Sequence, residues 1–307
     1  MTDTSSTSRR RALQCMAWAG TGLLWTLRGG VPVASLIGAA SAATKGFSFA
    51  QISDTHIGFS KPANPDPAAT LREAIGKIAA LPEKPAFLIH TGDITQLAKP
   101  KEFDDFDELI KEARLDVHYT PGEHDVLDEK PGTLYFARYG KGARGGGWRS
   151  FEHGGVHFVC LVNVLDLKAG GMGALGAEQI AWLREDLAGK SASTPIVVFA
   201  HIPLWTIAAD WGWGTQDSAE ALKLLARFGS VTVLNGHIHQ IMQKVEGHVA
   251  FHTARSTAFP QPAPGAAPAP GPKLVPAGEL RETLGVRQVT LVKGGQPLAI
   301  ADHSLAM

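Results

Sequence analysis

The sequence predicts a layered α/β fold in a single domain, and three observations lead to this prediction. From Phe47 onward, short apolar segments of strand length alternate with longer segments whose apolar residues have helical spacing. More strand-like segments follow after Ile241. Several of the apolar segments run directly into turn residues that carry Asp or His side chains. Alternating strands and helices build a sheet covered by helices, so functional residues are expected beyond the carboxyl ends of the strands.

The expected elements follow one another in chain order. Strands are predicted at residues 47–52, 87–91, 117–120, 148–151, 156–162, 195–200 and 231–234. Helices are predicted at residues 67–81, 102–114, 176–187 and 219–228. The Gly154-Gly155 pair predicts a hairpin between two of these strands. The chain after Ile241 is expected to be rich in strands, apart from residues 278–284.

Residues 260–278 have the sequence PQPAPGAAPAPGPKLVPAG, which is rich in Pro, Ala and Gly. Such a composition is typical of a linker or an extended loop. Fewer than thirty residues follow this segment, so a linker to a further domain is not favoured. We therefore expect a surface loop that lies on the one domain formed by residues 44–307.

The composition excludes several classes of protein. The chain has 307 residues, of which 44% are hydrophobic and 19% charged, as in a globular protein. It has 29 Lys and Arg against 29 Asp and Glu, which argues against a stable nucleic-acid partner because such a partner requires a basic face. Two cysteines cannot form a disulfide scaffold.

Residues 1–43 are predicted to be a cleavable export signal. Three arginines, at positions 9–11, precede an apolar run over residues 12–27 and small residues that end in Ala40-Ser41-Ala42. The segment Ser8–Leu13 resembles a twin-arginine signal, with Ala12 where that pattern favours Phe. The resemblance implies passage through the export machinery for folded proteins and a periplasmic or secreted destination.

Cleavage of this signal would change the charge of the chain. The mature chain would have 25 basic and 28 acidic residues, a net charge of −3, and Cys160 as its single cysteine. No membrane anchor is expected after cleavage, because the apolar run is shorter than about 20 residues and is interrupted by Gly20 and Gly22.

Five short segments with Asp, Glu or His side chains follow predicted strands. They are Asp54-Thr55-His56, Gly92-Asp93, Gly122-Glu123-His124-Asp125, His201 and Gly236-His237-Ile238-His239. Carboxylate and imidazole groups suit divalent and trivalent first-row metals. Alternate residues of an extended strand end point to the same side, and a preceding glycine allows close backbone approach. One such segment alone is more often a loop or a helix cap, but all five in this order predict a metal site.

This order of motifs resembles the calcineurin-like metallophosphoesterase superfamily, whose pattern is D-x-H, G-D, G-N-H-D/E, H and G-H-x-H, over residues 54–239. Among its members, the chain is most similar to small bacterial phosphodiesterase-like proteins. The resemblance implies a four-layer α-β-β-α sandwich of two mixed sheets with a dinuclear metal centre. By motif, the first metal would bind Asp54, His56 and His239, the second would bind Glu123, His201 and His237, and Asp93 would bridge the two.

The resemblance also implies hydrolysis of a small phosphoester, with a phosphodiester slightly preferred, through attack by a metal-bridging hydroxide. His124 would protonate the leaving oxygen or stabilise the transition state. Asp125 is a candidate to orient the His124 imidazole, and a turn-forming role is an equal alternative. Two other functions stay open: a phosphomonoesterase or nucleotidase, and a metal-binding protein without turnover.

Two residues depart from related patterns. Glu123 stands where the superfamily usually has Asn, so two divalent ions with three carboxylates would leave a formal charge of +1 instead of +2. We therefore expect Glu123 to favour a trivalent–divalent pair from the Fe, Mn or Zn class, unless its side chain points away from the site. Gln96 stands where purple acid phosphatases have a Tyr ligand, so a tyrosinate–iron site is not expected.

The loop after His201 contains Trp205, Trp211 and Trp213. These side chains are candidates to form the wall of a pocket or to stack on a flat substrate, and packing beneath the loop is the favoured alternative. Arg255 and the segment 260–278 are candidates to close the same pocket. His90 is expected to face the core or to support a ligand rather than to bind a metal.

Overall fold

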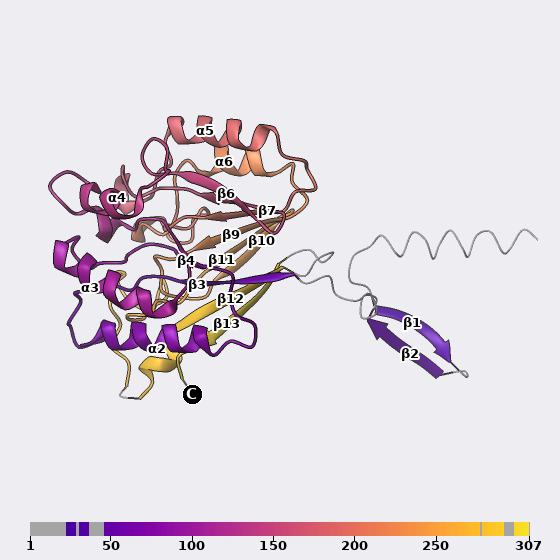
Figure 1. Cartoon of the computed structure of the whole chain (residues 1–307), viewed down its shortest axis with the longest axis horizontal. Helices are drawn as coiled ribbons and strands as arrows, with labels where there is room; N and C mark the ends of the chain where they lie inside the picture. The colour runs from indigo at the N-terminus through magenta and orange to yellow at the C-terminus, as the bar shows by residue number, and fades with distance from the viewer. Residues whose placement is uncertain (1–22, 29–30, 37–45, 277, 292–297, 307) are drawn as a thin grey trace, which may run out of the picture.

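The computed structural model describes residues 23–28, 31–36, 46–276, 278–291 and 298–306. The export signal predicted over residues 1–43 lies mostly outside the described residues. Within that range the structure describes two strands, β1 (Leu23–Arg28) and β2 (Val31–Leu36), which pair in antiparallel orientation (Figure 1). None of the helices in the described ranges is both long and apolar enough to cross a membrane.

Two mixed sheets pack face to face (Figure 1). The five-stranded sheet has the order β13-β12-β3-β4-β5. Its strands are β3 (Phe47–Ile52), β4 (Leu88–His90), β5 (Val117–Tyr119), β12 (Gly285–Leu291) and β13 (Ala299–Ser304). Strands β3, β4 and β5 are parallel, whereas β12 is antiparallel to both of its neighbours. The parallel strands therefore end at one common edge.

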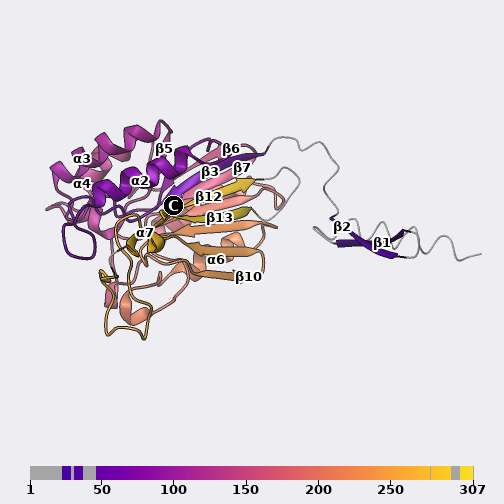
Figure 2. The ribbon, with the colours of Figure 1, turned by 90° about the horizontal axis from the view of Figure 1, so that it is seen from below.

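The six-stranded sheet has the order β10-β11-β9-β8-β7-β6. Its strands are β6 (Arg149–His153), β7 (Val156–Cys160), β8 (Ile196–Phe199), β9 (Val231–Asn235), β10 (Gln243–Glu246) and β11 (Val249–Thr253). The four central strands are parallel, and the edge strands β6 and β10 are antiparallel to their neighbours. The strands of both sheets run in similar directions (Figure 2).

Helices cover the outer face of each sheet (Figure 1). Helices α2 (Pro67–Ala79) and α3 (Pro100–Ile110) pack on the five-stranded sheet, and α5 (Ala177–Ala188) and α6 (Ser218–Leu225) pack on the six-stranded sheet. A short helix, α7 (Leu280–Thr283), lies within the predicted exception at 278–284. The architecture is the predicted four-layer α-β-β-α sandwich.

Strand β8 shows how the sequence produces these layers. Its four residues are all apolar and buried, as expected for a central parallel strand covered on both faces. Ile196 and Val198 pack against α5 and α6, whereas Val197 and Phe199 pack between the two sheets. Because Phe199 is fully buried, its replacement by Ala would cost about 3–5 kcal/mol.

The sequence does not predict α4 (Thr133–Tyr139), which lies between β5 and β6. Seven residues are too few to show helical periodicity. The helix is instead fixed at its start by Asp128, whose carboxylate accepts hydrogen bonds from the amides of Gly132 (2.6 Å) and Leu134 (2.9 Å). Its formation therefore depends on capping rather than on an apolar pattern.

Candidate metal centre

The candidate ligands lie in loops that follow five strands of the two sheets. Asp54 and His56 follow β3, Asp93 follows β4, Glu123 follows β5, His201 follows β8, and His237 and His239 follow β9. The structure brings all seven side chains together in overlapping groups whose ligand atoms lie within 4.8 Å of one another. Residues that are far apart in the sequence therefore form one site beyond the carboxyl ends of strands of both sheets.

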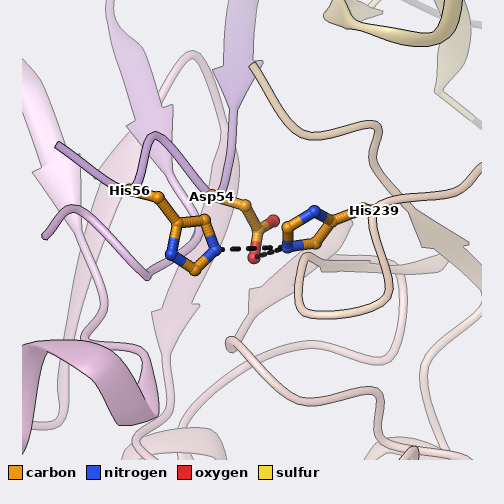
Figure 3. A group of neighbouring side chains, drawn as sticks. All are labelled: Asp54, His56 and His239. Carbon is orange, nitrogen blue, oxygen red and sulfur yellow. Dashed lines mark hydrogen bonds and ion pairs between the residues drawn. The ribbon is translucent and has the colours of Figure 1, made fainter. Parts of the chain in front are cut away.

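The first donor set consists of Asp54, His56 and His239. Their side chains point toward one another from two separate segments (Figure 3). His239 Nε2 lies 3.3 Å from Asp54 Oδ1 and 3.3 Å from His56 Nε2. All three residues are buried, so the donors face the protein interior rather than bulk water. This geometry matches the ligand set that the sequence predicts for the first metal.

The second donor set consists of Glu123, His201 and His237. Glu123 Oε2 lies 2.9 Å from His201 Nε2, and Glu123 Oε1 lies 2.9 Å from His237 Nδ1. The alternative in which the Glu123 side chain points away is therefore wrong. Asp93 Oδ2 lies 3.5 Å from His56 in one set and 3.5 Å from His201 in the other, which is the position of a bridging ligand.

Unpaired polar atoms indicate what this cluster binds. Within the described part of the chain, His201 Nε2, Glu123 Oε2 and both ring nitrogens of His237 are buried and make no hydrogen bond. Some of these atoms are only 2.9 Å apart, but their directions do not satisfy hydrogen-bond geometry. One ligand atom from each of the three residues lies within 4.8 Å of the others, and imidazole and carboxylate donors in this arrangement fit first-row metal ions.

Hydrogen bonds to backbone carbonyls orient two of the imidazoles. His201 Nδ1 donates to the carbonyl of Thr91 (2.6 Å), and His239 Nδ1 donates to the carbonyl of Phe259 (2.5 Å). In the neutral ring, each bond favours the tautomer in which Nε2 is unprotonated and available to a metal. Phe259 could not be recognised from the sequence, because any residue type can supply a backbone carbonyl acceptor.

The backbone at the site adopts an unusual conformation. Seven non-glycine residues in the described ranges have positive φ, and five of them are ligand candidates: Asp54 (55°), His56 (41°), Asp93 (54°), His237 (70°) and His239 (54°). A non-glycine residue in this region costs about 1–3 kcal/mol and persists only where the surrounding structure enforces it. The fold therefore stabilises a strained arrangement that points these side chains at one another.

Two glycines allow the loops to approach closely. A Cβ atom on Gly122 would lie 2.0 Å from Asp93 Oδ1, and one on Gly236 would lie 2.0 Å from the Ser53 hydroxyl and 2.7 Å from Asp54 Oδ2. Any larger residue at either position would displace a carboxylate of the site. These contacts support the expectation that glycine precedes the ligands because the backbone comes close to the metal centre.

The electrostatics of the site favour the ionisation state that a metal requires at His56 and Glu123, whereas at His201 they oppose it. Burial lowers the pKa of His56 to about 3, so its imidazole is neutral. Burial alone would raise the pKa of Glu123, but the imidazoles of His237 and His201 outweigh it and hold the pKa well below its usual range. Burial likewise opposes the charged form of His201, yet Asp93 and Glu123 raise its pKa well above the usual value.

His124 lies at the edge of the site, where its ring contacts that of His56 edge-on at 4.9 Å. Its Nδ1 donates to the carbonyl of Gln96 (2.6 Å), which leaves Nε2 free. Burial lowers the pKa of His124, but the charges of Asp93 and Glu123 outweigh burial and raise it. A histidine with this arrangement can hold a proton at Nε2 next to the donor sets.

Asp125 does not make the contact proposed for it from the sequence. Its carboxylate accepts hydrogen bonds from the amides of Ile94 (3.1 Å), Thr95 (2.9 Å) and Gly122 (3.0 Å). The His124 ring bonds to Gln96 instead. Asp125 therefore links the loop that carries Asp93 to the loop that carries Glu123. This structural role is close to the turn-forming role that is the alternative for Asp125. Burial, together with the charge of Asp93, raises its pKa to about 7.

His90 is buried beside the site but belongs to neither donor set. Its Nδ1 accepts a hydrogen bond from the amide of Gly92 (3.2 Å), and its Nε2 lies 3.1 Å from the hydroxyl of Thr55. This agrees with the expectation that His90 supports the ligand loops.

Of the three tryptophans, one packs beneath the loop and two line a pocket. Trp205 packs on Phe251 with ring centroids 5.2 Å apart, as expected for packing beneath the loop. Trp211 and Trp213 instead line a cavity of about 290 Å³ next to Glu123. Residues of the segment 260–278 line the same cavity, whereas Arg255 does not; its guanidinium donates to the carbonyl of Glu282.

Comparisons with known proteins agree with this geometry. The sequence pattern of the family described as Calcineurin-like phosphoesterase matches residues 47–241. A relative described as a probable glycerophosphodiester phosphodiesterase GpdQ, from Arcobacter nitrofigilis, is 27% identical over 222 residues, which cover 67% of this chain and 77% of the relative.

Two solved structures share the fold. One is a dimetal phosphatase from Danio rerio, with a TM-score of 0.60 and 15% identity over 85% of this chain and 99% of the other. The other is a purple acid phosphatase from yellow lupin (Lupinus luteus) seeds, with a TM-score of 0.61 and 13% identity over 85% of this chain and 52% of the other. With its two mixed sheets, its converging donor sets and the family match over most of its length, the chain belongs to the calcineurin-like phosphoesterase family of metal-dependent hydrolases.

Proposed function

We propose that the chain hydrolyses phosphate diesters with two metal ions held by the two donor sets. The observation that carries this proposal is the position of Asp93, whose Oδ2 lies 3.5 Å from one imidazole of each set. Asp93 would be shared by both donor sets, and two ions held there would supply the charge and the activated water for hydrolysis of one phosphoryl group. The name of the Arcobacter relative, a probable glycerophosphodiester phosphodiesterase, supports a diester substrate.

The chain supplies the positioning for this chemistry. When bound, two such ions provide an activated water and neutralise charge on the phosphoryl oxygens. Asp54 is held for this purpose by the amide of His237, which donates to both of its carboxylate oxygens (3.1 and 3.2 Å). His124 holds a proton at Nε2, in position to deliver it to the oxygen that leaves.

The charge near the site favours a diester over a monoester. A phosphate monoester has about two negative charges near pH 7, whereas a diester has one. None of the described residues that line the adjoining cavity is Lys or Arg. Apart from His124, the described lining residues would offer a monoester no positive charge, and a diester needs none.

Purified protein loaded separately with Mn, Zn or Fe tests this proposal on two esters. We expect a higher kcat/KM for bis-para-nitrophenyl phosphate than for para-nitrophenyl phosphate. A preference for the second ester would favour a phosphomonoesterase or nucleotidase. Failure of fully metal-loaded protein to hydrolyse either ester would favour a metal-binding protein without turnover.

We propose further that Glu123 favours a trivalent–divalent metal pair. Its two oxygens lie 2.9 Å from His201 and His237, so its negative charge adds to those of Asp54 and Asp93 in the site. Metal analysis of Glu123→Gln, which removes the charge at nearly constant shape, should show two divalent ions. Glu123→Asp keeps the charge and should keep the trivalent ion. Equal metal content and identity in wild type and Glu123→Gln would contradict this assignment.

We propose that residues 1–43 direct the folded protein to the bacterial periplasm and are then removed. The arginines at positions 9–11, the apolar run and the Ala40-Ser41-Ala42 segment support this proposal. Fractionation of cells that express the full chain should yield a periplasmic product whose mass corresponds to cleavage after Ala42 or Ala43. Replacing Arg10 and Arg11 by Lys should retain the protein inside, whereas Arg28→Lys is the matched control and should not.

A further inference from the structure

A cavity of about 290 Å³ adjoins the second donor set. Three loops that are distant in the sequence form its outer wall and contribute Leu167, Gly171, Trp211, Trp213, Pro270 and Gly271. Figure 2 shows the loop 260–276 below α7, beside the loop that precedes α6. Loops from three different regions of the chain therefore meet around one small volume.

The first two loops are fixed to each other by backbone contacts. Gly173 donates its amide hydrogen to the carbonyl of Gly214 (2.9 Å), and Gly212 has a φ of 72°. A Cβ atom on Gly212 would lie 2.9 Å from the carbonyl oxygen of Gly171, so the two chains touch at glycines. The tryptophans on either side of Gly212 are therefore held in position before any ligand binds, which lowers the entropic cost of binding.

The third loop is fixed to the metal centre by Gln261. Its side-chain amide donates to the carbonyl of His237 (2.9 Å), and its Oε1 accepts from the amide of Gly271 (3.1 Å). One side chain thus joins a candidate metal ligand to the cavity wall. The distance between the wall and the second donor set is consequently fixed.

The wall has the chemistry of a site for a flat, uncharged ring. The rings of Trp211 and Trp213 meet edge-to-face, 5.0 Å apart at 81°. Trp213 is 1% exposed, whereas Trp211 is only half-buried and keeps accessible ring surface. None of the described lining residues is Lys or Arg, so the wall offers no partner to an anionic group. Aromatic surface of this kind stacks on flat groups.

The opposite side of the cavity is lined by residues of the candidate active site. Glu123 and His237 of the second donor set line it, together with His124, whose Nε2 is directed toward the leaving oxygen in the proposed function. A group in the cavity is therefore next to the residue that would protonate it. A group bound in the cavity therefore corresponds to the alcohol that leaves, and not to the alcohol that stays bonded to phosphorus.

We propose that this cavity binds the leaving alcohol of the ester and selects a small, flat, uncharged ring, such as a substituted phenol. The inference rests on the proposed phosphodiesterase function and specifies its substrate class. Trp211 is the specificity-determining residue, because it presents the accessible ring. The volume, near the lower limit for small-molecule pockets, restricts the group to one ring of modest size.

The test uses two phosphinates that share one negative charge with a diester and contain no hydrolysable ester bond. Calorimetry with metal-loaded protein compares benzyl(methyl)phosphinate with dimethylphosphinate, which lacks the ring. We expect wild type to bind the benzyl compound about 10-fold more tightly. Trp211→Ala should reduce this preference to less than about 2-fold, and Trp211→Phe should restore most of it.

Trp205→Ala is the matched control, because Trp205 packs on Phe251 and does not line the cavity. Its preference for the benzyl compound should equal that of wild type, even if its stability is lower. Equal affinity of wild type for both phosphinates, or an unchanged preference in Trp211→Ala, would overturn the proposal. Since neither measurement requires turnover, failure of the cavity assignment is distinct from failure of the proposed hydrolysis.

Discussion

Two clusters in this molecule contain a buried histidine beside carboxylates, and they differ in whether the imidazole nitrogens are hydrogen-bonded to those carboxylates. One is the metal centre. The other, here called the β7 cluster, consists of Ser150, Glu152, His157, Asp186 and Lys190. His157 and His239 are each 2% exposed, so burial does not distinguish them. The difference lies in where their polar atoms point.

In the β7 cluster both imidazole nitrogens are paired. His157 Nδ1 lies 2.8 Å from Glu152 Oε1, and His157 Nε2 lies 2.6 Å from Asp186 Oδ2. Ser150 and Lys190 donate to the same two carboxylates. The cluster therefore joins β6, β7 and α5 through side chains that satisfy one another, as buried polar groups in stable structures do.

In the metal centre, by contrast, His201 Nε2 and His237 Nδ1 approach Glu123 without hydrogen-bond geometry, and the backbone has positive φ at five ligand candidates. A group that is buried, unpaired and strained reduces stability, so its retention requires a compensating partner. The contrast shows that a buried histidine is identified as a ligand by the direction of its ring nitrogens. The depth of the imidazole is the same in both clusters, and each has carboxylates beside it.

The substitution with the largest expected effect alters the metal centre and leaves the β7 cluster intact. His239→Ala should lower kcat/KM by at least about 10³-fold, because it removes a ligand of the first donor set. It should also reduce the metal content measured on the same sample. The free energy of unfolding of the metal-free protein should fall by only about 1–2 kcal/mol, since the substitution leaves the Phe259 carbonyl without its donor. Unchanged rates would contradict the site assignment.

The reciprocal substitution is His157→Ala, which should affect stability rather than catalysis. The substitution removes the buried imidazole and leaves Asp186 and Glu152 without their shared partner, at a cost of about 1–3 kcal/mol in the free energy of unfolding. Urea denaturation measures this change. The kcat per folded, metal-loaded molecule should equal that of wild type, and a loss of kcat above about 10-fold would show that the two clusters are coupled.

Sequence patterns predict the metal centre better than the β7 cluster, for a physical reason. Ligands such as Asp54 and His56 alternate at a strand end and can be recognised locally. His157 becomes meaningful only through Asp186, which lies 29 residues away on α5. Likewise, the strands at 47–52 and 231–234 follow from local apolar pattern, whereas α4 depends on the cap from Asp128. The role of Asp125 also depends on tertiary contacts, because Ile94 and Thr95, two of its partners, belong to another loop.

Asp125 is intermediate between the two clusters, because it is fully paired yet adjacent to ligands. Asp125→Asn keeps the shape but places an amide group against some of the donors from Ile94, Thr95 and Gly122. We expect kcat/KM to fall by about 10- to 100-fold, as is typical when the support of a metal ligand is lost. Metal titration of the variant should show weaker binding. If stability falls while kcat per bound metal is unchanged, the role of Asp125 is structural only.

The smallest expected effect concerns pH and the β7 cluster. Burial would raise the pKa of Asp186, but hydrogen bonds from His157 and Ser150 outweigh it and hold the pKa below its usual range. A carboxylate with a lowered pKa in the folded state contributes stability above its unfolded pKa, near 4, and loses that contribution as pH falls through the folded value. Asp186→Asn should therefore destabilise the protein most at pH 5 and above. The difference in the free energy of unfolding between the variant and wild type should shrink below pH 4, by less than about 1 kcal/mol because the group is only partly shielded from solvent.

Denaturation of both proteins at a series of pH values isolates this contribution, since every other carboxylate is common to the two. A difference that does not vary with pH would show that Asp186 stabilises the cluster through packing rather than through its charge.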